Sequence, residues 1–583
     1  MRIREERLRP YAWSVLGLTL AATLAGAFFY ARLDWTEPRL LAGEATYLAQ
    51  ARSLAYDFDL TYERADFDRL LLDRGAEPPD LELASGSGGR RIAFDRPFPY
   101  ALWLAPFVRL APESGFAIAN ALLLAAASLF AAWVLQPYLG LATPVWITVL
   151  LGASVAWSYV WLATGDLFLW ALTVAAFGLL ARLHVGGHWA EPEPPRAVKR
   201  AVLAAGALLA IPAATEPLYG VLAAAAFFVV PARRERGVYA LGLAVGLASI
   251  VAVGWWAGSG IPLSATSFRF TPETGFPLVD FTAADWPDAV RRFQALHWDE
   301  APRFAWGLDP LLWAWDALYL LAGRHIGLLP YYLPAVLLAL AGSFAGWRRA
   351  IAIAAGAWMI GVVILHPFDL YGGEGALANR LFLPVYGAAF FLLDRRPWIG
   401  WAAALPLAAA VFLWKLWAEP GGDPISRDGG YRYVTAAAER YLPYETSQRR
   451  IPANELADHQ GLRLLLRNEG VWSEARRERL VLDEKRRARM VIASPEEMPA
   501  FVLEFGADAP SELRVRGAEL AERVLLADGG IAFRLRPGSG ARRHPLWWTP
   551  ERQWLYLVDF ELPADPGGSA SSLGFRLVPE SGR

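Results

Sequence analysis

Long apolar stretches, each close to the length of a membrane-crossing helix, recur through the first 417 residues of this chain. Such runs reach from Tyr11 to Tyr30, from Gly115 to Leu135 and on to Trp398–Trp417. A helix needs roughly 20 apolar residues to cross the hydrocarbon core of a bilayer. The hydrophobic fraction of 55% over 583 residues is also too high for one water-soluble core. The chain is therefore predicted to be a polytopic membrane protein.

The positions of arginine and lysine predict how the helices are oriented, because short cytoplasmic loops carry the positive excess. Basic residues gather in five places: Arg2, Arg4, Arg7 and Arg9; Arg196, Lys199 and Arg200; Arg233, Arg234 and Arg236; Arg348 and Arg349; Arg395 and Arg396. With all of these inside, about eleven helices cross the membrane. They are predicted at 11–30, 115–136, 143–160, 166–185, 200–215, 217–232, 238–257, 326–346, 350–366, 381–394 and 398–416. The N-terminus is then cytoplasmic, and the chain beyond the last helix lies outside.

The hydrophobic pattern also divides the chain into two domains. Residues 1–417 are predicted to form an all-α membrane domain with two long outward loops, 31–99 and 258–323. In the first loop, Glu44–Leu54 places apolar residues at helical spacing, as a helix lying on the membrane surface would. Residues 418–583 are predicted to form a water-soluble domain on the outer side.

Short β-type runs separated by Gly, Pro and Asp turns mark the water-soluble domain. They predict a small β-sandwich with strands at 501–505, 512–516, 531–535, 553–562 and 573–578. The lead-in, residues 420–500, alternates helical and charged stretches and is predicted to be a linker or a helical cap. Trp547 and Trp548 fit core packing better than stacking on a sugar ring, although a glycan-binding module stays open.

Composition excludes several kinds of chemistry. The chain has no cysteine, so disulfides, thiolate metal sites and thiol catalysis are excluded. Its seven histidines lack the spacing of a zinc site, and no structural metal is predicted. The net charge of −1 argues against a nucleic-acid partner. No cofactor is required by these residues, and dependence on a divalent metal stays open.

Ionisable residues at the outward ends of the helices are the candidates for function, because charge at membrane depth is costly. These candidates are Glu44, Asp57, Asp59, Asp166, Glu216, Arg324, His325, His366, Asp369, Glu374 and Arg380. A carboxylate can take a proton from an acceptor hydroxyl, and cations can hold an anionic leaving group. This face therefore offers the groups that a transfer reaction needs.

The chain resembles the GT-C superfamily of membrane glycosyltransferases, which includes the aminoarabinose transferases of lipid A and the protein O-mannosyltransferases. The resemblance rests on the first helix and the acidic loop after it, where Gly43–Leu54 reads G-E-A-T-Y-L-A-Q-A-R-S-L. It extends to Arg96–Pro106, Gly323–Tyr332 and Tyr371–Pro384. The resemblance implies an inverting transfer of a sugar from a polyprenyl-phosphate donor to an acceptor outside the membrane.

The resemblance also implies where the catalytic base lies. Members of the superfamily carry an Asp-Glu pair in the first loop, and here the first position of that pair is Gly43. Glu44 is then the expected base, with Asp34 or Glu37 as alternatives, or the site is degenerate. Glu44 alternatively caps its helix, where the dipole favours a carboxylate.

Donor phosphate binding is assigned first to Arg380, because a guanidinium can hold a phosphate through two hydrogen bonds. Asn379 would support it, and Arg324 and His325 could face the same phosphate. Arg380 alternatively reaches the interface or pairs with Glu374. Further acidic candidates are Asp59, Asp166 and Glu374, although Asp166 fits better as an N-terminal helix cap.

Two short patterns in the first loop are set aside. Asp57–Asp59 spells the Asp-x-Asp box that holds metal in soluble glycosyltransferases, but no βαβ unit surrounds it. Gly86–Gly89 lacks the strand and helix that flank a phosphate-binding loop. Neither is predicted to bind a metal or a nucleotide.

The resemblance places the protein in a bacterial inner membrane, with its site at the periplasmic face. Its expected partners are a polyprenyl-phosphate sugar donor, membrane lipids, and an envelope glycan, lipid or protein as acceptor. Two other classes stay open: a transporter of envelope glycolipid, and a non-catalytic membrane scaffold. No internal repeat and no mid-helix charge cluster favours the transporter.

Overall fold

The computed structural model divides into two compact units. The membrane unit consists of Met1–Leu308, Tyr331–Val362 and Arg380–Gly422, and the C-terminal unit of Asp309–Pro330, Val363–Asn379 and Asp423–Arg583. The residues that the structure describes are 2–29, 43–63, 65–66, 69, 81–85, 92–94, 96–112, 114–185, 196–256, 267–269, 310–341, 344–366, 370, 377–393, 400–420, 432–443, 445, 458–459, 462–466, 471–474, 477–481, 487–494, 500–505, 514–516, 518–526, 530–537, 554–561 and 572–579. Two segments that precede residue 417 thus group with the C-terminal residues.

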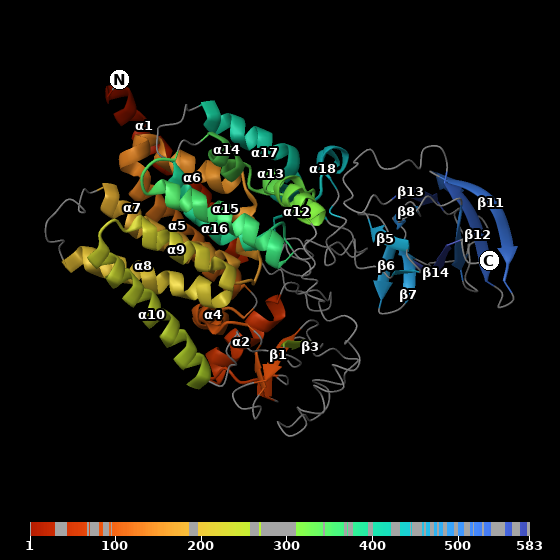
Figure 1. Ribbon diagram of the computed structural model, residues 1–583, viewed down its shortest axis with the longest axis horizontal. Coiled ribbons are helices and arrows are strands. Elements are labelled where there is room, and N and C mark those ends of the chain that lie inside the picture. The colour runs from red at the N-terminus through yellow and green to blue at the C-terminus, as the bar shows by residue number, and fades with distance from the viewer. Residues whose placement is uncertain are drawn as a thin grey trace. The chain divides into compact units, whose positions relative to one another are not determined.

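Apolar helices make up most of the membrane unit (Figure 1). In the described part of the chain, seven stretches are long and apolar enough to cross a membrane: Ala12–Phe29, Gly115–Gly152, Asp166–His184, Arg196–Thr215, Arg233–Trp256, Arg348–Leu365 and Gly400–Ala418. They lie in α1 (Arg2–Phe29), α5 (Gly115–Leu139) with α6 (Thr143–Gly152), α7 (Asp166–Val185), α8 (Arg196–Thr215), α10 (Arg233–Trp256), α15 (Arg348–Leu365) and α17 (Gly400–Ala418). Two shorter apolar stretches are Pro217–Val229, which includes α9 (Gly220–Val229), and Arg380–Leu392, which includes α16 (Leu383–Ala389). The chain is a multi-pass membrane protein, and eleven crossings stays a prediction.

One predicted crossing, 326–346, is not a continuous helix. The chain forms α13 (Leu328–Tyr331) and then α14 (Leu333–Ala341). Pro334 lies in the first turn of α14, where a missing N–H is tolerated. It cannot continue a helix from α13, because its ring would clash with the carbonyl of Pro330. The prediction of a single helix over this range is wrong for that reason.

Helix α2 (Glu44–Tyr56) confirms the helix predicted in the first loop but not its exposure. Eleven of its 13 residues are buried, and it packs against α4 (Phe98–Leu110). Its polar side chains have partners inside the protein. Gln50 donates to the carbonyl of Arg96 at 3.0 Å, and Ser53 donates to Asp59 at 2.8 Å. These hydrogen bonds let the polar face of α2 be buried by protein, and its position at the membrane surface stays a prediction.

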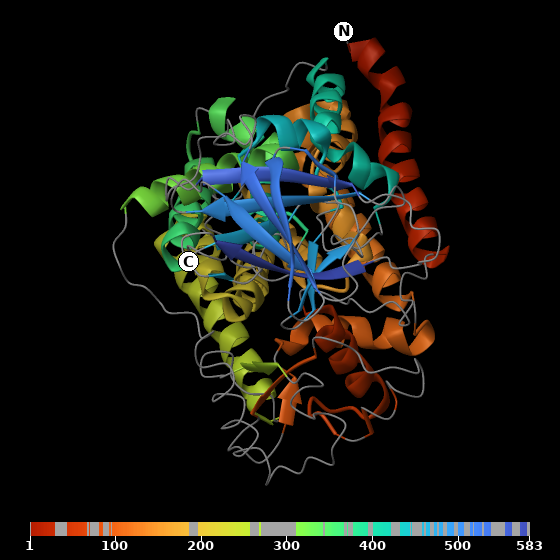
Figure 2. The same cartoon turned by 90° about the vertical axis from the view of Figure 1, so that its right-hand side faces the viewer.

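The two long loops that are predicted to face outward share a small antiparallel sheet. Its strands are β1 (Glu82–Ser85) and β2 (Ile92–Phe94) from the first loop and β3 (Ser267–Arg269) from the second, in the order β2-β1-β3. Both views place this sheet, α2 and α4 at the same end of the membrane unit's helices (Figures 1 and 2). Helix α12 (Pro310–Ala322) lies within the second predicted loop, 258–323, whose bounds stay a prediction.

The C-terminal unit contains two antiparallel sheets after the short helix α18 (Ala436–Tyr441). One sheet has the order β10-β13-β8-β5-β4 and the other β11-β12-β9-β14-β7-β6. The strands are β4 (Asp458–His459), β5 (Leu462–Leu466), β6 (Val471–Glu474), β7 (Arg477–Val481), β8 (Arg487–Ser494), β9 (Phe501–Phe505), β10 (Arg514–Arg516), β11 (Ala518–Leu525), β12 (Ile531–Pro537), β13 (Trp554–Glu561) and β14 (Ser572–Pro579). The predicted strands are present, and packing as a sandwich stays a prediction. The prediction of a linker or helical cap over 420–500 is wrong, since β4–β8 lie there and pair with later strands.

Candidate active site

Glu44 lies at the start of α2 and binds the turn that precedes α7. Its Oε1 accepts the backbone N–H of Ala163 at 2.7 Å, and the residue is 1% exposed. Asn120 of α5 holds the same turn, because its Nδ2 donates to the carbonyl of Leu162 at 2.9 Å. The Oδ1 of Asn120 also accepts the hydroxyl of Tyr100 at 3.0 Å. Side chains from α2 and α5 thus fix the backbone just before α7.

Asp166 is the first residue of α7, where the helix dipole favours a carboxylate. The residue is 8% exposed, and its Oδ2 is buried without a hydrogen-bond partner among the described residues. A buried carboxylate oxygen in that state costs free energy. The predicted role as a helix cap therefore does not explain why Oδ2 of Asp166 is buried. The charges of two cations, Arg380 and Arg96, act on its carboxylate.

Arg96 lies directly against the backbone of Gly43. Gly43 has a left-handed backbone, with φ of 82°, that residues with a Cβ rarely adopt. A Cβ added there would lie 2.4 Å from Nε and 2.6 Å from Nη2 of Arg96. The guanidinium of Arg96 thus occupies the space of a side chain at position 43. This is the position where the GT-C superfamily carries an acidic residue and this chain does not.

Arg380 begins the 3-10 turn η7 (Arg380–Phe382), which leads into α16. The hydroxyl of Tyr219 fixes this turn by donating to the carbonyl of Leu381 at 2.9 Å. Asn379 is fully buried, and Ala378 before it has a positive φ of 54°. Such a conformation costs an alanine roughly 1–3 kcal/mol and occurs often at functional sites. The backbone that presents Arg380 is therefore held tightly.

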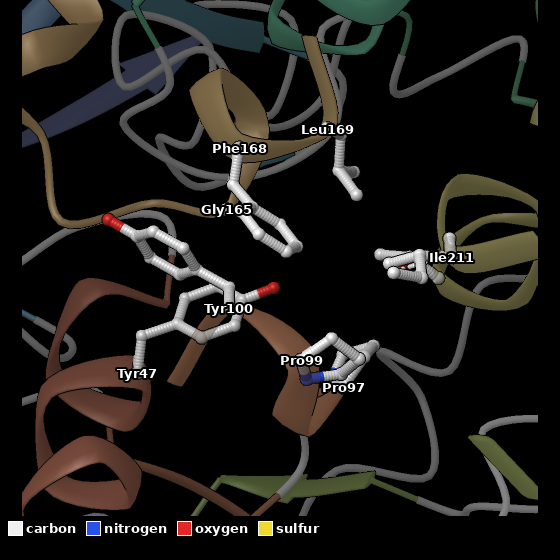
Figure 3. Close-up of a pocket in the computed structure, with 9 residues that line it drawn as sticks. Tyr47, Pro97, Pro99, Tyr100, Gly165, Phe168, Leu169 and Ile211 are labelled. Carbon is white, nitrogen blue, oxygen red and sulfur yellow. Dashed lines mark hydrogen bonds between the residues drawn. The ribbon is translucent and has the colours of Figure 1, made fainter. Parts of the chain in front are cut away.

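A pocket opens between α2, α4, α7 and α8 (Figure 3). It is lined by Tyr47, Pro97, Pro99, Tyr100, Gly165, Phe168, Leu169, Ile211 and Thr215. Figure 3 shows the hydroxyl of Tyr47 pointing toward the middle of the pocket. The rings of Tyr47, Tyr100 and Phe168 thus flank a hollow at the start of α7.

Tyr100 connects the pocket with the two carboxylates. Its ring meets the ring of Tyr47 edge-to-face, with centroids 5.1 Å apart. The charges of Glu44 and Asp166 both act on its hydroxyl. Gly165 packs closely on this ring, because a Cβ there would lie 3.1 Å from the Tyr47 hydroxyl oxygen, and the tyrosine would have to shift slightly. The pocket and the charged groups therefore form one site within the membrane unit.

Arg324 and His325 lie in the C-terminal unit and bind the segment after α18. Nη2 of Arg324 donates to the carbonyl of Leu442 at 2.9 Å. Glu445 is fully buried, and its Oε2 lies 2.7 Å from Nδ1 of His325. Its Oε1 accepts the backbone N–H groups of His325 at 2.7 Å and Ile326 at 3.2 Å. These contacts anchor Leu442, Pro443 and Glu445, and a role of Arg324 and His325 in donor binding stays a prediction.

Asp59 lies in the turn after α2 and supports that turn. Its Oδ1 accepts hydrogen bonds from Ser53 at 2.8 Å and from the backbone N–H of Thr61 at 3.2 Å. Asp57 pairs instead with Arg69, whose Nη2 lies 2.7 Å and 2.8 Å from its two oxygens. No group of three or more metal-ligating side chains occurs in the described ranges. Asp57 and Asp59 thus stabilise the turn and loop that follow α2.

Asp66, which the sequence patterns do not single out, has a pKa that is unusually high for an aspartate. Burial, with repulsion from Asp57 and Asp59 beside it, raises the pKa of Asp66 from 3.8 to about 7. Arg69 at 3.3 Å and the backbone N–H of Glu63 at 3.0 Å act in the opposite direction. The group is therefore partly protonated at neutral pH.

Some expected site residues fall outside the described residues, namely Asp34, Glu37 and Glu374. Of the remaining candidates, the structure brings together Glu44, Asp166 and Arg380. It adds Arg96, Tyr47 and Tyr100, which have no predicted role. Arg96 lies in Arg96–Pro106, one of the segments that carry the GT-C resemblance. Its place in that segment is the sequence feature that could have marked it as a site residue.

Comparisons with known proteins give matches among solved structures alone. No protein-family model matches the chain, and no curated protein matches its sequence. Among solved structures it is similar to ArnT from Cupriavidus metallidurans bound to undecaprenyl phosphate, with a TM-score of 0.38 and 16% identity over 74% of this chain and 68% of that chain. The apo state of the same protein gives a TM-score of 0.37 and 17% identity over the same shares.

A second similar structure is the arabinosyltransferase EmbB from Mycobacterium smegmatis. Its TM-score is 0.31, with 12% identity over 96% of this chain and 64% of that chain. The TM-scores of 0.31–0.38 and identities of 12–17% assign no substrate and no residue role to this chain.

Proposed function

We propose that this protein is a glycosyltransferase that moves a sugar from a polyprenyl-phosphate donor to an acceptor at the outer face of the membrane. One observation carries the proposal. Two carboxylates, Glu44 and Asp166, and two guanidinium groups, Arg96 and Arg380, meet beside a pocket lined by aromatic side chains. They come from the starts of α2 and α7, the segment before α4, and η7.

This set of groups fits the chemistry of sugar transfer. A carboxylate takes the proton of the acceptor hydroxyl as its oxygen attacks the anomeric carbon of the donor. The bond from that carbon to the phosphate oxygen breaks, and the electron pair leaves with the polyprenyl phosphate. Arginine stabilises the charge that develops on this leaving group. Aromatic side chains such as Tyr47 and Tyr100 offer apolar faces to a sugar ring.

The outer side of the membrane is proposed for the site because the basic clusters lie elsewhere. Arg196 and Arg233 begin α8 and α10, whereas Glu44 begins the helix of the first outward loop. Positive residues collect on the cytoplasmic side. The proposed setting is the bacterial inner membrane, with an envelope glycan, lipid or protein as acceptor.

Binding of the carrier lipid tests the proposed function. Undecaprenyl phosphate is titrated onto the full chain in nanodiscs, with wild type compared to Arg380→Ala. Loss of a hydrogen bond to a charged group costs about 1.5–3 kcal/mol, so the affinity is expected to fall roughly 10- to 150-fold. Arg234→Ala, at an exposed arginine of α10 outside the site, is the matched control and binds as wild type does. Absence of saturable binding to wild type would refute the donor class.

A further inference from the structure

We infer that Asp166 is the catalytic carboxylate that takes the acceptor proton, and that Glu44 is a positioning residue that holds the turn leading to it. This inference rests on the proposed glycosyl transfer and assigns roles within its site. It differs from the expectation of Glu44 as base. The two carboxylates have different surroundings, and these surroundings carry the assignment.

Glu44 is already engaged by the protein. Its Oε1 accepts the N–H of Ala163 at 2.7 Å, and the residue is almost wholly buried. A hydrogen bond from a backbone N–H to a carboxylate is charge-assisted and favours the ionised form. A proton placed on Glu44 would weaken the bond that fixes residues 163–165. Glu44 therefore connects α2 with the turn before α7 and holds that turn in place.

Asp166 has the opposite surroundings. Its Oδ2 is buried and has no hydrogen-bond partner in the described parts of the chain. A buried acceptor without a donor is destabilised, and more strongly so when it is charged. A hydroxyl that enters the site supplies the missing donor, and transfer of its proton removes the buried charge. The unfavourable burial of the unpaired Asp166 carboxylate, when no acceptor is bound, thus favours uptake of the acceptor's proton.

The flanking segments keep Asp166 in place. Asn120 binds the carbonyl of Leu162 at 2.9 Å, so the turn before α7 is fixed from α5 as well as from α2. Arg96 reaches the neighbourhood of Asp166 across Gly43, where no side chain bars its way. We assign Arg96 as a second positioning residue. It compensates the Asp166 charge while the site is empty.

The step balances without any further reactant. The acceptor oxygen forms a bond to the anomeric carbon, and its proton passes to Oδ2 of Asp166. The bond between the anomeric carbon and the phosphate oxygen breaks, and both electrons leave with the polyprenyl phosphate. Asp166 then releases its proton to solvent before the next turnover.

Two isosteric variants separate the roles. Membranes that contain wild type, Asp166→Asn or Glu44→Gln at matched expression are charged with labelled polyprenyl-phosphate sugars, and transfer is followed against pH. Loss of a general base costs about 10²–10⁴-fold in rate, so Asp166→Asn is expected to lose at least 100-fold. Glu44→Gln keeps an acceptor oxygen for Ala163 and is expected to lose less than about 10-fold.

The pH profile and carrier binding distinguish catalysis from folding. Glu44→Gln is expected to keep the fall in rate at low pH, whereas the residual rate of Asp166→Asn is expected to be flat. Both variants should bind undecaprenyl phosphate within about threefold of wild type, since the arginines remain. Asp166→Glu is expected to recover part of the rate and the acid limb.

Two results would overturn the assignment. A larger loss in Glu44→Gln than in Asp166→Asn would make Glu44 the base and leave the proposed function intact. Equal losses in both would exclude a purely positioning role for Glu44. Failure of wild type to bind the carrier or transfer label would instead remove the proposed function, and the inference with it.

Discussion

At the scale of single residues, the arrangement of the site depends on Gly43, which has no side chain. Gly43 has a left-handed φ of 82° and leaves its space to the guanidinium of Arg96. The sequence shows that position 43 departs from the superfamily, but it cannot show which group fills the space. Arg96 lies 53 positions away along the chain, and only tertiary packing brings the two together.

Replacing Gly43 tests this arrangement. Gly43→Ala is expected to lower stability by about 1–3 kcal/mol, because alanine is strained at this φ and its Cβ meets Arg96. The melting midpoint in detergent measures the loss. Arg96→Ala in the same chain removes the contact but not the strained φ, so the double variant should recover part of the loss. A Gly43→Ala protein as stable as wild type would show that Arg96 moves away freely.

Asp66 predicts a pH dependence of stability. Because burial raises its pKa from 3.8 to about 7, the folded protein holds a proton that the unfolded chain releases. This group therefore favours the folded state below about pH 4, and its contribution is lost as pH rises from about 4 to 7. The size is at most about 4 kcal/mol for a shift of roughly three pKa units.

Asp66→Asn removes this titration. The melting temperature of the variant is expected to vary less than that of wild type between pH 4 and 7.5, and to exceed it at pH 7.5. Glu519→Gln, at an exposed carboxylate of β11, is the matched control and should keep the slope of wild type. Parallel pH profiles for wild type and Asp66→Asn would contradict the account.

At the scale of elements, apolar periodicity identifies helices well but not how they are broken or covered. The helix at Glu44–Tyr56 follows from its spacing, whereas its burial depends on partners such as Asp59 and the carbonyl of Arg96. The break between α13 and α14 depends on where prolines fall within a turn. The strands β4–β8 escape prediction because their pairing partners lie up to about 100 residues away.

The anchor around Glu445 makes a prediction at this scale. Glu445→Ala removes the carboxylate that binds the backbone N–H groups of His325 and Ile326 and Nδ1 of His325. A buried donor left without an acceptor costs about 1–3 kcal/mol. Limited proteolysis should therefore cut earlier near residues 442–445 than in wild type. Glu522→Ala, at an exposed pair with Arg534, is the control and should leave the cleavage pattern unchanged.

At the scale of the whole molecule, the proposed orientation rests on charge and can be tested through the absence of cysteine. Two single cysteines at exposed positions mark the two sides of the membrane: Arg234→Cys in the first turn of α10 and Arg523→Cys in β11. A membrane-impermeant maleimide added to intact spheroplasts should label Arg523→Cys and spare Arg234→Cys. Permeabilised cells should show labelling of both, and the reverse pattern in intact cells would invert the proposed topology.

The most direct test of sugar transfer follows a label from the lipid fraction to an acceptor. Membranes with wild type, Arg380→Ala or no added protein are given polyprenyl-phosphate sugars carrying label in the sugar, and label remaining in the lipid is measured over time. The account predicts that wild type removes label from the lipid with release of polyprenyl phosphate, while Arg380→Ala does so at least 10-fold more slowly. If wild type leaves the labelled lipids as intact as membranes without the protein do, across several sugars, the chain is not a glycosyltransferase of this class.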